Sequence, residues 1–331
     1  MNSSANAERY LVTGAYGCIG AWVVRELLHA HAHVVAYDLA TDSARMSLII
    51  NDADPTSLIR VQADITDLAA LERTLDQHAI TRVIHLAALQ VPFCRANPPA
   101  GAAVNVVGTA NIFEAVARRL DTIPHVVFAS SIAAYDAHVP GAPPAMAGTP
   151  STIYGVYKRA TEQMAQLYAD ERGVASIGLR PHTIYGPGRD QGLTSAPTMA
   201  MMASAADRDF VIPYTGSAQF QHAQDAARVF VQATQAPASG AKMANLAGHV
   251  ASIDKIIDLI HARSPKTADH ISATGTALAF PESVPSGDLD EIIGATTFDR
   301  PLADGIADTI ATFGSAIRAG LIDPHAVLGA P

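Results

Sequence analysis

Through its first 180 residues the chain alternates between short apolar runs and longer stretches of helical periodicity, and this pattern constrains the fold more than any other feature. The apolar runs are nearly continuous, which is typical of strands buried on both faces of a sheet. They lie at residues 10–13, 33–38, 58–63, 82–87, 125–130 and 175–179. Helical patterns separate them at residues 17–30, 68–78, 102–120 and 154–172. The alternation predicts right-handed βαβ units, and therefore an α/β fold with a doubly wound parallel (Rossmann) sheet.

Beyond Arg180 the pattern becomes irregular, and a second, smaller unit is expected there. Helices are predicted at residues 198–206, 225–235, 252–263 and 302–319, and a short apolar run at 243–246 is a candidate to return to the sheet. We expect two interleaved domains: residues 1–181 with return segments near 219–248, and a C-terminal substrate-binding unit of residues 182–218 and 249–331. Residues 139–149, rich in Pro, Gly and Ala, are expected to form a mobile loop.

Composition argues against several classes of function. The 331 residues carry 31 Asp and Glu against 22 Lys and Arg, a formal charge of −9, whereas nucleic-acid binding needs clustered positive charge. No basic run would dock on a lipid surface, and no apolar stretch of about 20 residues suggests a membrane span. The polar N-terminus lacks the features of a signal peptide. We therefore expect a soluble, cytoplasmic protein.

Cysteine and histidine usage points to neither disulfides nor metal. The two cysteines, Cys18 and Cys94, are too few for a disulfide framework. The chain has 13 histidines, but no His-Glu-x-x-His motif or cysteine pair supports a zinc site. The expectation is that no metal is bound.

The first predicted strand runs into a glycine-rich turn that reads TGAYGCIG over residues 13–20. Gly14, Gly17 and Gly20 allow the chain to double back and let backbone N–H groups approach a pyrophosphate, while the next helix points its positive end at that charge. Glycine triplets also serve ordinary turns, but this one lies between a predicted strand and a predicted helix. The sequence therefore predicts a dinucleotide-binding site.

Acidic residues at two later strand ends refine the prediction for the cofactor. Asp38 ends the second predicted strand, where a carboxylate can accept both adenosine-ribose hydroxyls and would repel a 2′-phosphate. No Lys or Arg lies between Asp38 and Arg45, so NAD is predicted rather than NADP. Capping of the next turn fits Asp38 equally well. Asp64 and Ile65 follow the third strand, where they would hold the adenine edge, or Asp64 would cap the following helix.

A tyrosine and a lysine four residues apart form the candidate catalytic pair. Tyr154 and Lys158 share one face of a predicted helix. An ammonium about 4 Å from the tyrosine, at an effective dielectric of about 20, would lower the tyrosine pKa by about three units. Ser131 lies at a predicted strand end, where its hydroxyl can face the ligand crevice. Taken alone, this spacing is common in surface packing, and a strand-end serine is also an ordinary turn residue.

Together these motifs resemble the extended short-chain dehydrogenases/reductases (SDRs), which include nucleotide-sugar epimerases and dehydratases. The resemblance covers about residues 9–260 and rests on TGAYGCIG, Asp38, Asp64-Ile65, HLAA at 85–88, Asn105, FASSIAAY at 128–135, YGVYKRATE at 154–162 and LRPHTIYGPG at 179–188. It implies that Tyr154 is the general acid/base and that Lys158 holds the nicotinamide ribose and lowers the tyrosine pKa. It also implies that Ser131 orients the substrate and Asn105 supports a proton relay.

The resemblance also implies a set of NAD-binding residues and an assembly. The set comprises Gly14, Tyr16, Gly17, Cys18, Ile19, Gly20, Asp38, Asp64, Ile65, Leu86, Ala87, Ala88, Asn105, Tyr154 and Lys158. His85 is expected to be structural. The family commonly forms homodimers through the helices at 102–120 and 154–172, where the apolar positions include Val106, Ile112, Val156 and Met164.

Departures from the family pattern concern the substrate. Ile132 and Ala133 replace the Asp-Glu that dehydratases carry after the catalytic hydroxyl, which argues against sugar dehydration. Gln219 begins the segment that replaces an Arg-Asp-Phe gripping the diphosphate, Thr183 replaces an Asn, and the Arg expected near residues 280–282 is absent. A diphosphate would lack its usual counter-charges. A nucleotide-linked substrate is therefore disfavoured.

The sequence thus favours a small sugar, sugar acid or polyol as the substrate. The expected contacts are Gln90, Ser131, Ile132, His182, Thr183, Arg189 and Gln219. Arg189 would pair with a substrate carboxylate, or would lie at the surface of a Pro/Gly-rich loop. The predicted function is NAD-dependent hydride transfer at a secondary alcohol. Two alternatives remain: an NAD-dependent carbohydrate epimerase, including one for nucleotide sugars, with tightly bound NAD, and a non-catalytic dinucleotide-sensing protein.

Overall fold

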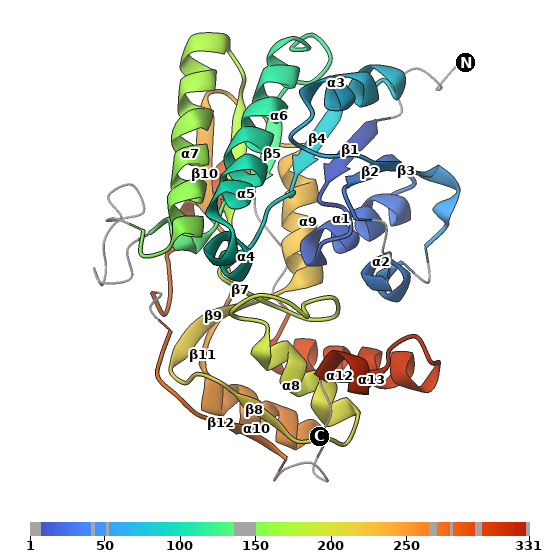
Figure 1. Ribbon diagram of the computed structural model, residues 1–331, viewed down its shortest axis with the longest axis vertical. Helices are drawn as coiled ribbons and strands as arrows, with labels where there is room; N and C mark the ends of the chain where they lie inside the picture. Colours follow the sequence, from blue (N-terminus) through green and yellow to red (C-terminus); the bar gives the residue numbers. More distant parts are fainter. Residues whose placement is uncertain are drawn as a thin grey trace.

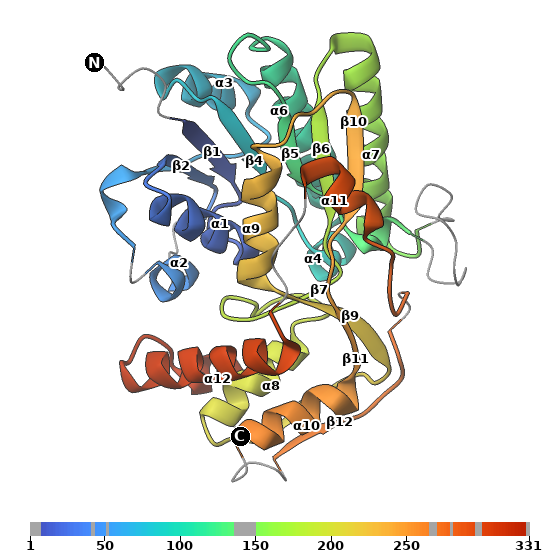
Figure 2. The same ribbon diagram turned by 180° about the vertical axis from the view of Figure 1, so that it is seen from behind.

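The computed structural model of the protein describes residues 8–40, 44–50, 53–135, 150–264, 270–278, 281–294 and 300–328. A layered α/β part lies above a smaller lobe in Figure 1, and Figure 2 shows the same two parts from behind. The mobile loop predicted at residues 139–149 lies outside the described residues.

Seven parallel strands form the central sheet of the upper part, in the order β10-β6-β5-β4-β1-β2-β3. They are β1 (Arg9–Thr13), β2 (His33–Asp38), β3 (Leu58–Gln62), β4 (Arg82–His85), β5 (Val126–Ala129), β6 (Ser176–Arg180) and β10 (Ala241–Asn245). The predicted doubly wound parallel sheet is confirmed. Because the strand order reverses at β1, the carboxyl ends of β1 and β4 border the crevice where ligands bind in such sheets.

Helices cover both faces of this sheet (Figures 1 and 2). One face carries α1 (Cys18–His29), α9 (Ala223–Ala233) and α11 (Gly287–Ile293), and the other carries α3 (Leu68–Gln77), α6 (Gly108–Ala117) and α7 (Ile153–Arg172). Residues of β1 alternate between the two cores: Tyr10 and Val12 pack with α1 and α9, whereas Leu11 packs with α3 and α6. This two-sided burial explains the nearly continuous apolar character of the strand sequences.

The helical segment before β5 contains a π-helical turn. Helix α5 (Pro98–Ala102) passes through this turn (Ala103–Val107) into α6. By length and composition alone, Pro98–Ala117 is apolar enough to cross a membrane, with a mean hydropathy of 1.3, although a core helix meets the same criterion. Ile112 is fully buried in the core, so it is not available for the predicted dimer contact, whereas Val156 on α7 is 48% exposed.

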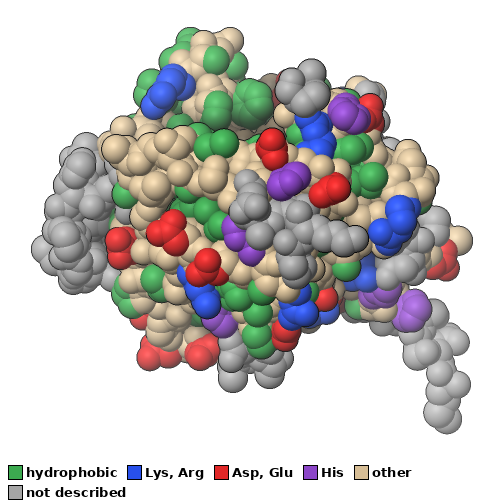
Figure 3. Space-filling model, turned by 90° about the horizontal axis from the view of Figure 1, so that it is seen from below, with side chains coloured by type: hydrophobic (Ala, Val, Ile, Leu, Met, Phe, Trp, Pro, Cys, Tyr) green, Lys and Arg blue, Asp and Glu red, His purple; other side chains and the backbone are tan. Residues whose placement is uncertain are grey.

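The lower lobe is built on two small sheets. One contains β7 (Thr183–Tyr185), β9 (Ser217–His222) and β11 (His249–Ser252), and the other contains β8 (Phe210–Ile212) and β12 (Ile271–Ala273). Their apolar core is shared with α8 (Ala196–Ala205), α10 (Ile253–Arg263), α12 (Leu302–Arg318) and α13 (Pro324–Leu328). On the face in Figure 3, acidic, basic and histidine side chains of the described residues are interspersed with apolar ones.

Four short elements complete the described fold. Helix α2 (Ala44–Ile49) follows β2, and a 3₁₀ turn (Pro55–Ser57) precedes β3. Helix α4 (Val91–Ala96) follows β4, and a second 3₁₀ turn (Ile132–Ala134) follows β5. The connections after β2, β4 and β5 therefore begin with short helical segments close to the strand ends.

The packing places two segments differently from the predicted domain division. Strand β9 pairs with β7 and β11 in the lower lobe, although the sequence assigns residues 219–222 to the larger unit. Helix α11 inserts Leu289 and Ile293 into the core of the upper part, although it falls within residues 249–331. The apolar face of α11 covers β10 and α9, which would otherwise expose apolar surface. We therefore group α9, β10 and α11 with the upper part.

Candidate active site

The glycine turn between β1 and α1 packs directly against the chain after β4. Gly14 has a left-handed φ of +67°, and a Cβ at this position would lie 2.6 Å from the backbone N of Ala87. A Cβ on Gly20 would lie 2.1 Å from the carbonyl oxygen of Gly14. Neither position has room for a side chain. The glycines therefore bring the N-terminus of α1 close to the carboxyl ends of β1 and β4.

The first turn of α1 is suited to an anion. Its N-cap residue, Gly17, makes no side-chain capping hydrogen bond. The first N–H groups of a helix have no intrahelical acceptor, and the helix dipole favours negative charge beside them. This glycine-lined cradle, which Cβ atoms would fill, fits the pyrophosphate of NAD. Gly17, Cys18 and Ile19 are the residues that would hold it.

Asp38 both caps a turn and faces the cofactor crevice. Its two carboxylate oxygens accept hydrogen bonds from the backbone N of Tyr16 and of Ala40, each at 2.9 Å. It also lines a cavity of about 490 Å³, together with Asp64 and Ile65. A carboxylate offers about four acceptor sites, so capping leaves acceptors for ribose hydroxyls. The two interpretations of Asp38 are therefore compatible.

Asp64 does not cap helix α3. Its carboxylate accepts a hydrogen bond from the backbone N of Thr66 at 2.8 Å and so stabilises the turn before the helix. The N-cap residue is Asp67, whose side chain accepts from the backbone N of Ala70. The helix begins three residues later than the capping alternative for Asp64 requires. Asp64 does line the 490 Å³ cavity, so the prediction that it holds the adenine edge stays a prediction.

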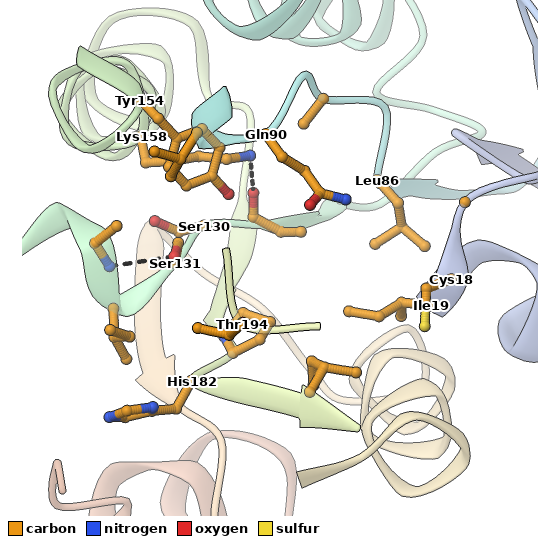
Figure 4. A pocket seen from close by; sticks show the side chains of 18 of the residues that line it. Cys18, Ile19, Leu86, Gln90, Ser130, Ser131, Tyr154, Lys158, His182 and Thr194 are labelled. Carbon is orange, nitrogen blue, oxygen red and sulfur yellow. Dashed lines mark hydrogen bonds between the residues drawn. The ribbon is translucent and has the colours of Figure 1, made fainter. Parts of the chain in front are cut away.

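A second cavity, of about 200 Å³, lies beside the glycine turn. In Figure 4, Tyr154 and Lys158 from α7 and Ser131 from the end of β5 lie on one side of it, with Cys18 and Ile19 of α1 on the other. The structure brings most of the predicted residues to this cavity. They are Gly14, Gly17, Cys18, Ile19, Gly20, Leu86, Ala88, Gln90, Ser131, Ile132, Tyr154, Lys158, His182, Thr183 and Arg189.

The Tyr154–Lys158 pair has the predicted arrangement but not the predicted electrostatics. Lys158 Nζ donates to the carbonyl oxygen of Ala129 at 2.7 Å and lies 5.7 Å from the centre of the Tyr154 ring. Burial lowers the pKa of Lys158 to about 8. Burial also raises the pKa of Tyr154 to about 12, against the opposing effects of a hydrogen bond with Ser131 and the charge of Arg189. The predicted lowering is not found, because the sequence argument omits desolvation.

Ser131 and Asn105 are both fixed by backbone contacts. Ser131 Oγ accepts a hydrogen bond from the backbone N of Ala133 at 3.1 Å and also hydrogen-bonds Tyr154. The Asn105 carboxamide accepts from the backbone N of Leu89 at 2.9 Å and donates to the Leu89 carbonyl at 3.0 Å. Asn105 projects from the π-helical turn and fixes the chain after β4. Its part in a proton relay stays a prediction.

Two histidines near the cavity are hydrogen-bonded through both ring nitrogens. The ring nitrogens of His85 lie 2.7 Å from Thr13 Oγ1 and 3.0 Å from Thr109 Oγ1. His182 Nε2 donates to the carbonyl of Pro281 at 2.7 Å, and its Nδ1 lies 3.1 Å from the hydroxyl of the next residue. Burial lowers the pKa of His85 to about 3 and that of His182 to about 4. Both rings are therefore neutral near pH 7.

Arg189 enters the cavity from the loop after β7. Its guanidinium donates to Gln90 Oε1 at 3.3 Å and to Thr194 Oγ1 at 3.1 Å, while its buried Nε has no partner within the described residues. The absence of a side chain at Gly192 makes room for Gln90, because a Cβ at Gly192 would lie 2.0 Å from Gln90 Oε1. A guanidinium with donors remaining is well suited to a carboxylate.

Gln219 does not reach either cavity. Its Oε1 accepts a hydrogen bond from the backbone N of Val284 at 2.9 Å, and its Nε2 lies 3.5 Å from the carbonyl of Leu246. Only 4% of the residue is exposed. Buried backbone groups need partners, and Gln219 supplies them to two crossing segments. We therefore remove it from the expected substrate contacts.

A buried ionic network behind the cavity escaped the sequence analysis. Arg180 Nε and Nη2 donate to the Glu162 carboxylate at 2.7 and 2.8 Å, and its Nη1 donates to the Tyr135 hydroxyl at 2.7 Å. Tyr135 donates to Asn245 at 2.9 Å, and Ser130 donates to Glu162. The available signal was the position of Glu162 and Arg180 in otherwise buried segments, where charges must pair. The network ties α7 to β5, β6 and β10 next to Ser131 and Lys158.

The fold and this cavity define a class of protein. A glycine cradle for a dinucleotide, and a tyrosine, lysine and serine facing the adjacent cavity, are the parts of a dinucleotide-dependent oxidoreductase. The family model described as the NAD dependent epimerase/dehydratase family matches residues 10–247. The chain therefore belongs to the NAD dependent epimerase/dehydratase family.

Comparison with known proteins gives both epimerases and dehydrogenases. UDP-glucuronate 4-epimerase 2 of Arabidopsis thaliana is 30% identical over 192 residues, which is 55% of this chain and 43% of that protein. The chain spans about half the length of the curated relatives it matches.

Two solved structures have the same fold over nearly the whole chain. UDP-N-acetylglucosamine 4-epimerase from Methanobrevibacter ruminantium M1, in complex with UDP-N-acetylmuramic acid, has a TM-score of 0.81, 21% identity and coverage of 94% of this chain and 99% of that one. A partial consensus L-threonine 3-dehydrogenase has a TM-score of 0.80, 22% identity and coverage of 93% and 99%.

Proposed function

We propose that this enzyme is an NAD-dependent dehydrogenase that oxidises a secondary alcohol of a small hydroxy acid, with sugar acids as the first candidates. The observation that carries the proposal is the position of Arg189, which lines the same 200 Å³ cavity as Tyr154 and Lys158. A guanidinium with unused donors in a partly closed cavity favours a planar carboxylate. The carboxylate would lie at Arg189 and the reacting hydroxyl at Tyr154.

Residues 281–285 support a substrate without a nucleotide. This segment packs against two residues that line the cavity: Pro281 accepts a hydrogen bond from His182, and Val284 packs against Ile132. The backbone N of Val284 also donates to Gln219. In the resemblance to nucleotide-sugar enzymes, the position of Gln219 corresponds to an arginine that grips the diphosphate. Here the side chain is neutral and already hydrogen-bonded. A diphosphate would find no counter-charge there and would leave buried groups unpaired.

Each member of the catalytic set has a distinct part in the proposed reaction. Tyr154 Oη takes the proton of the substrate hydroxyl, and Ser131, which already hydrogen-bonds Tyr154, orients the hydroxyl oxygen. The ammonium of Lys158 lies behind the tyrosine ring, where its charge favours the tyrosinate once it forms. Bound NAD supplies the hydride acceptor. The product is a ketone, or a lactone where the oxidised carbon is anomeric.

The similar proteins are consistent with a carboxylate in the substrate. Glucuronate, in the name of the Arabidopsis relative, is a sugar acid, and L-threonine, in the name of the consensus dehydrogenase, is a hydroxy acid. The first is linked to a nucleotide and the second is free. The neutral surroundings of Gln219 favour the free form for this chain.

An NAD-dependent epimerase is the second candidate, and the names of the curated relatives favour it. Epimerisation uses the same tyrosine, lysine and serine, but the hydride returns to the opposite face of the ketone and no net NADH forms. A dinucleotide-sensing protein without catalysis is the third candidate. Its weakness is that sensing alone does not require the Tyr154–Lys158 pair.

The test is NADH formation by the purified protein with NAD and a panel of aldonates, uronates, hydroxy amino acids, neutral aldoses and UDP-sugars. We expect stoichiometric NADH with an unlinked hydroxy acid, and a rate of NADH formation about 10³-fold lower in Tyr154→Phe. Isomer interconversion without net NADH establishes the epimerase instead. Reaction with UDP-sugars alone contradicts the inference drawn from Gln219.

We also propose a homodimer formed through α6, α7 and the adjoining π-helical turn. Three apolar side chains on these elements are exposed: Val107 at 48%, Val156 at 48% and Leu167 at 56%. Exposed apolar surface of this kind favours contact with another protein surface. Light scattering coupled to size exclusion tests the proposal. A mass near twice 34.6 kDa is expected, and Val156→Lys should shift it toward the monomer.

A further inference from the structure

The loop between β7 and α8 passes over the cofactor turn. The indole Nε1 of Trp22, on α1, donates to the carbonyl of Pro187 at 2.9 Å and fastens the start of this loop. Gly188 follows with a φ of +87°, and a Cβ there would be in van der Waals contact with the Cα of Cys18, at 3.9 Å. Cys18 is the first residue of α1. The loop therefore crosses the helix N-terminus that is suited to the pyrophosphate.

Asp190, further along the same loop, pairs with Arg45 on α2. Arg45 donates from Nε at 2.9 Å and from Nη2 at 2.6 Å to Asp190 Oδ1, and its Nε also lies 3.1 Å from Oδ2. Its Nη1 donates to the carbonyl of Tyr16 in the glycine turn at 3.3 Å. Both charged residues line the 490 Å³ cavity that contains Asp38. The pair thus joins α2 to the loop within the lining of the cofactor crevice.

We infer that the Arg45–Asp190 pair is a clasp that must open for NAD to enter and to leave. The two partners come from separate elements, α2 and the loop after β7, and both line the cavity that contains Asp38. Each element also contacts the cofactor turn, through Arg45 to the Tyr16 carbonyl and through Gly188 beside Cys18. A carboxylate held by two guanidinium nitrogens requires a defined geometry, so moving the loop away breaks the contact. Because the bond joins protein to protein, it controls the exchange rate of NAD more than its affinity. This inference depends on NAD binding and not on the proposed substrate.

Stopped-flow fluorescence of NADH with the full-length chain tests the clasp. The variants are Asp190→Asn, Arg45→Gln and the charge-swapped double variant R45D/D190R. Arg228→Gln is the matched control, since it removes an ion pair with Glu26 of 3.0 Å that borders neither cavity. We expect each single variant to raise both the association and the dissociation rate about tenfold, which corresponds to about 1.4 kcal/mol. The charge swap should restore slow exchange, and the control should match the wild type.

The equilibrium Kd separates a clasp from a direct cofactor contact. A clasp leaves Kd within about threefold, because both rates change together. An unchanged Kd also shows that the variants are folded. A faster dissociation rate with an unchanged association rate and a weaker Kd would mean that Arg45 binds the cofactor itself, and the clasp would be wrong. Unchanged rates in both single variants would also overturn it.

Discussion

The cofactor half and the substrate half of the active-site crevice are constructed by different means. The cofactor half comes mainly from one stretch of chain, where Gly14, Gly20 and Asp38 meet backbone groups. The substrate half joins side chains from distant segments, as where Arg189 bonds Gln90, 99 residues earlier. The steric demands of a single turn produce a recognisable spacing of glycines in the sequence, whereas side-chain pairs between distant segments produce no such spacing. Substitutions in the two halves should therefore have different consequences.

The largest effect is expected in the cofactor half, from Gly20→Ala. The new Cβ would meet the Gly14 carbonyl oxygen at 2.1 Å, and neither backbone can yield without opening the turn. We expect NADH binding to be lost in fluorescence titration, with a stability loss of more than about 4 kcal/mol. The matched control is Gly287→Ala, where a Cβ meets nothing within 4 Å. Normal NADH binding by Gly20→Ala would contradict the close packing of the turn.

Removing the Tyr154 hydroxyl should separate chemistry from cofactor binding. Tyr154→Phe is expected to lower kcat by about 10³-fold, the usual scale of a lost acid/base, and to leave the Kd of NADH nearly unchanged. Tyr157→Phe is the control, because that hydroxyl donates to the Pro98 carbonyl at 2.9 Å outside the cavity. Since burial raises the pKa of Tyr154 to about 12, oxidation by the wild type should accelerate from pH 6 to 8, where Lys158 keeps its charge, as tyrosinate forms. A flat profile over that range would argue against Tyr154 as the base.

Lys158 is expected to destabilise the folded protein, although catalysis requires it. Burial lowers its pKa from 10.5 to about 8, which corresponds to about 3 kcal/mol against the charged form. Lys158→Met removes this unfavourable burial of charge but also loses the hydrogen bond to Ala129, which contributes about 1 kcal/mol. The variant should therefore be more stable than the wild type by about 2 kcal/mol, and it should be inactive. Denaturant unfolding measures the first effect and NADH formation the second.

The same residue gives a pH dependence with a definite sign. Lys158 has a pKa of about 8 in the folded protein and about 10.5 in the unfolded chain. Between these values the unfolded chain binds more protons, so the stability of the folded protein should rise with pH from about 8 to 10. The rise should be absent in Lys158→Met and present in Lys255→Met, a control at an exposed lysine of α10. An equal rise in wild type and Lys158→Met would mean that other groups cause it.

The smallest effect is expected at Gln219, which lies behind the substrate half and reaches neither cavity. Gln219→Met keeps the volume but leaves the Val284 N–H without its acceptor. We expect a loss of about 1 kcal/mol in stability and a KM within about threefold of the wild type. Thermal unfolding and steady-state kinetics measure the two. A large rise in KM would return Gln219 to the substrate contacts.

The sequence predicted the sheet, the glycine turn and the meeting of Tyr154, Lys158 and Ser131 at one cavity, because each depends on local periodicity or spacing. The catalytic roles of the three residues stay predictions. It failed at Gln219, whose direction is set by the backbone of residue 284, and at the tyrosine pKa, which depends on burial. The Glu162–Arg180 and Arg45–Asp190 pairs join segments that only the folded chain brings together. Local geometry can be predicted from the spacing of residues along the chain, whereas burial and pairing between distant segments cannot.

The central proposal is that Arg189 selects a carboxylate. The direct measurement compares kcat/KM for a hydroxy-acid substrate and for its neutral carboxamide, in the wild type and in Arg189→Gln. We expect the wild type to favour the acid by about a hundredfold, the scale of a bidentate charged contact, and the variant to lose most of that preference with NADH binding unchanged. Equal kcat/KM values for acid and amide in the wild type would contradict the proposal.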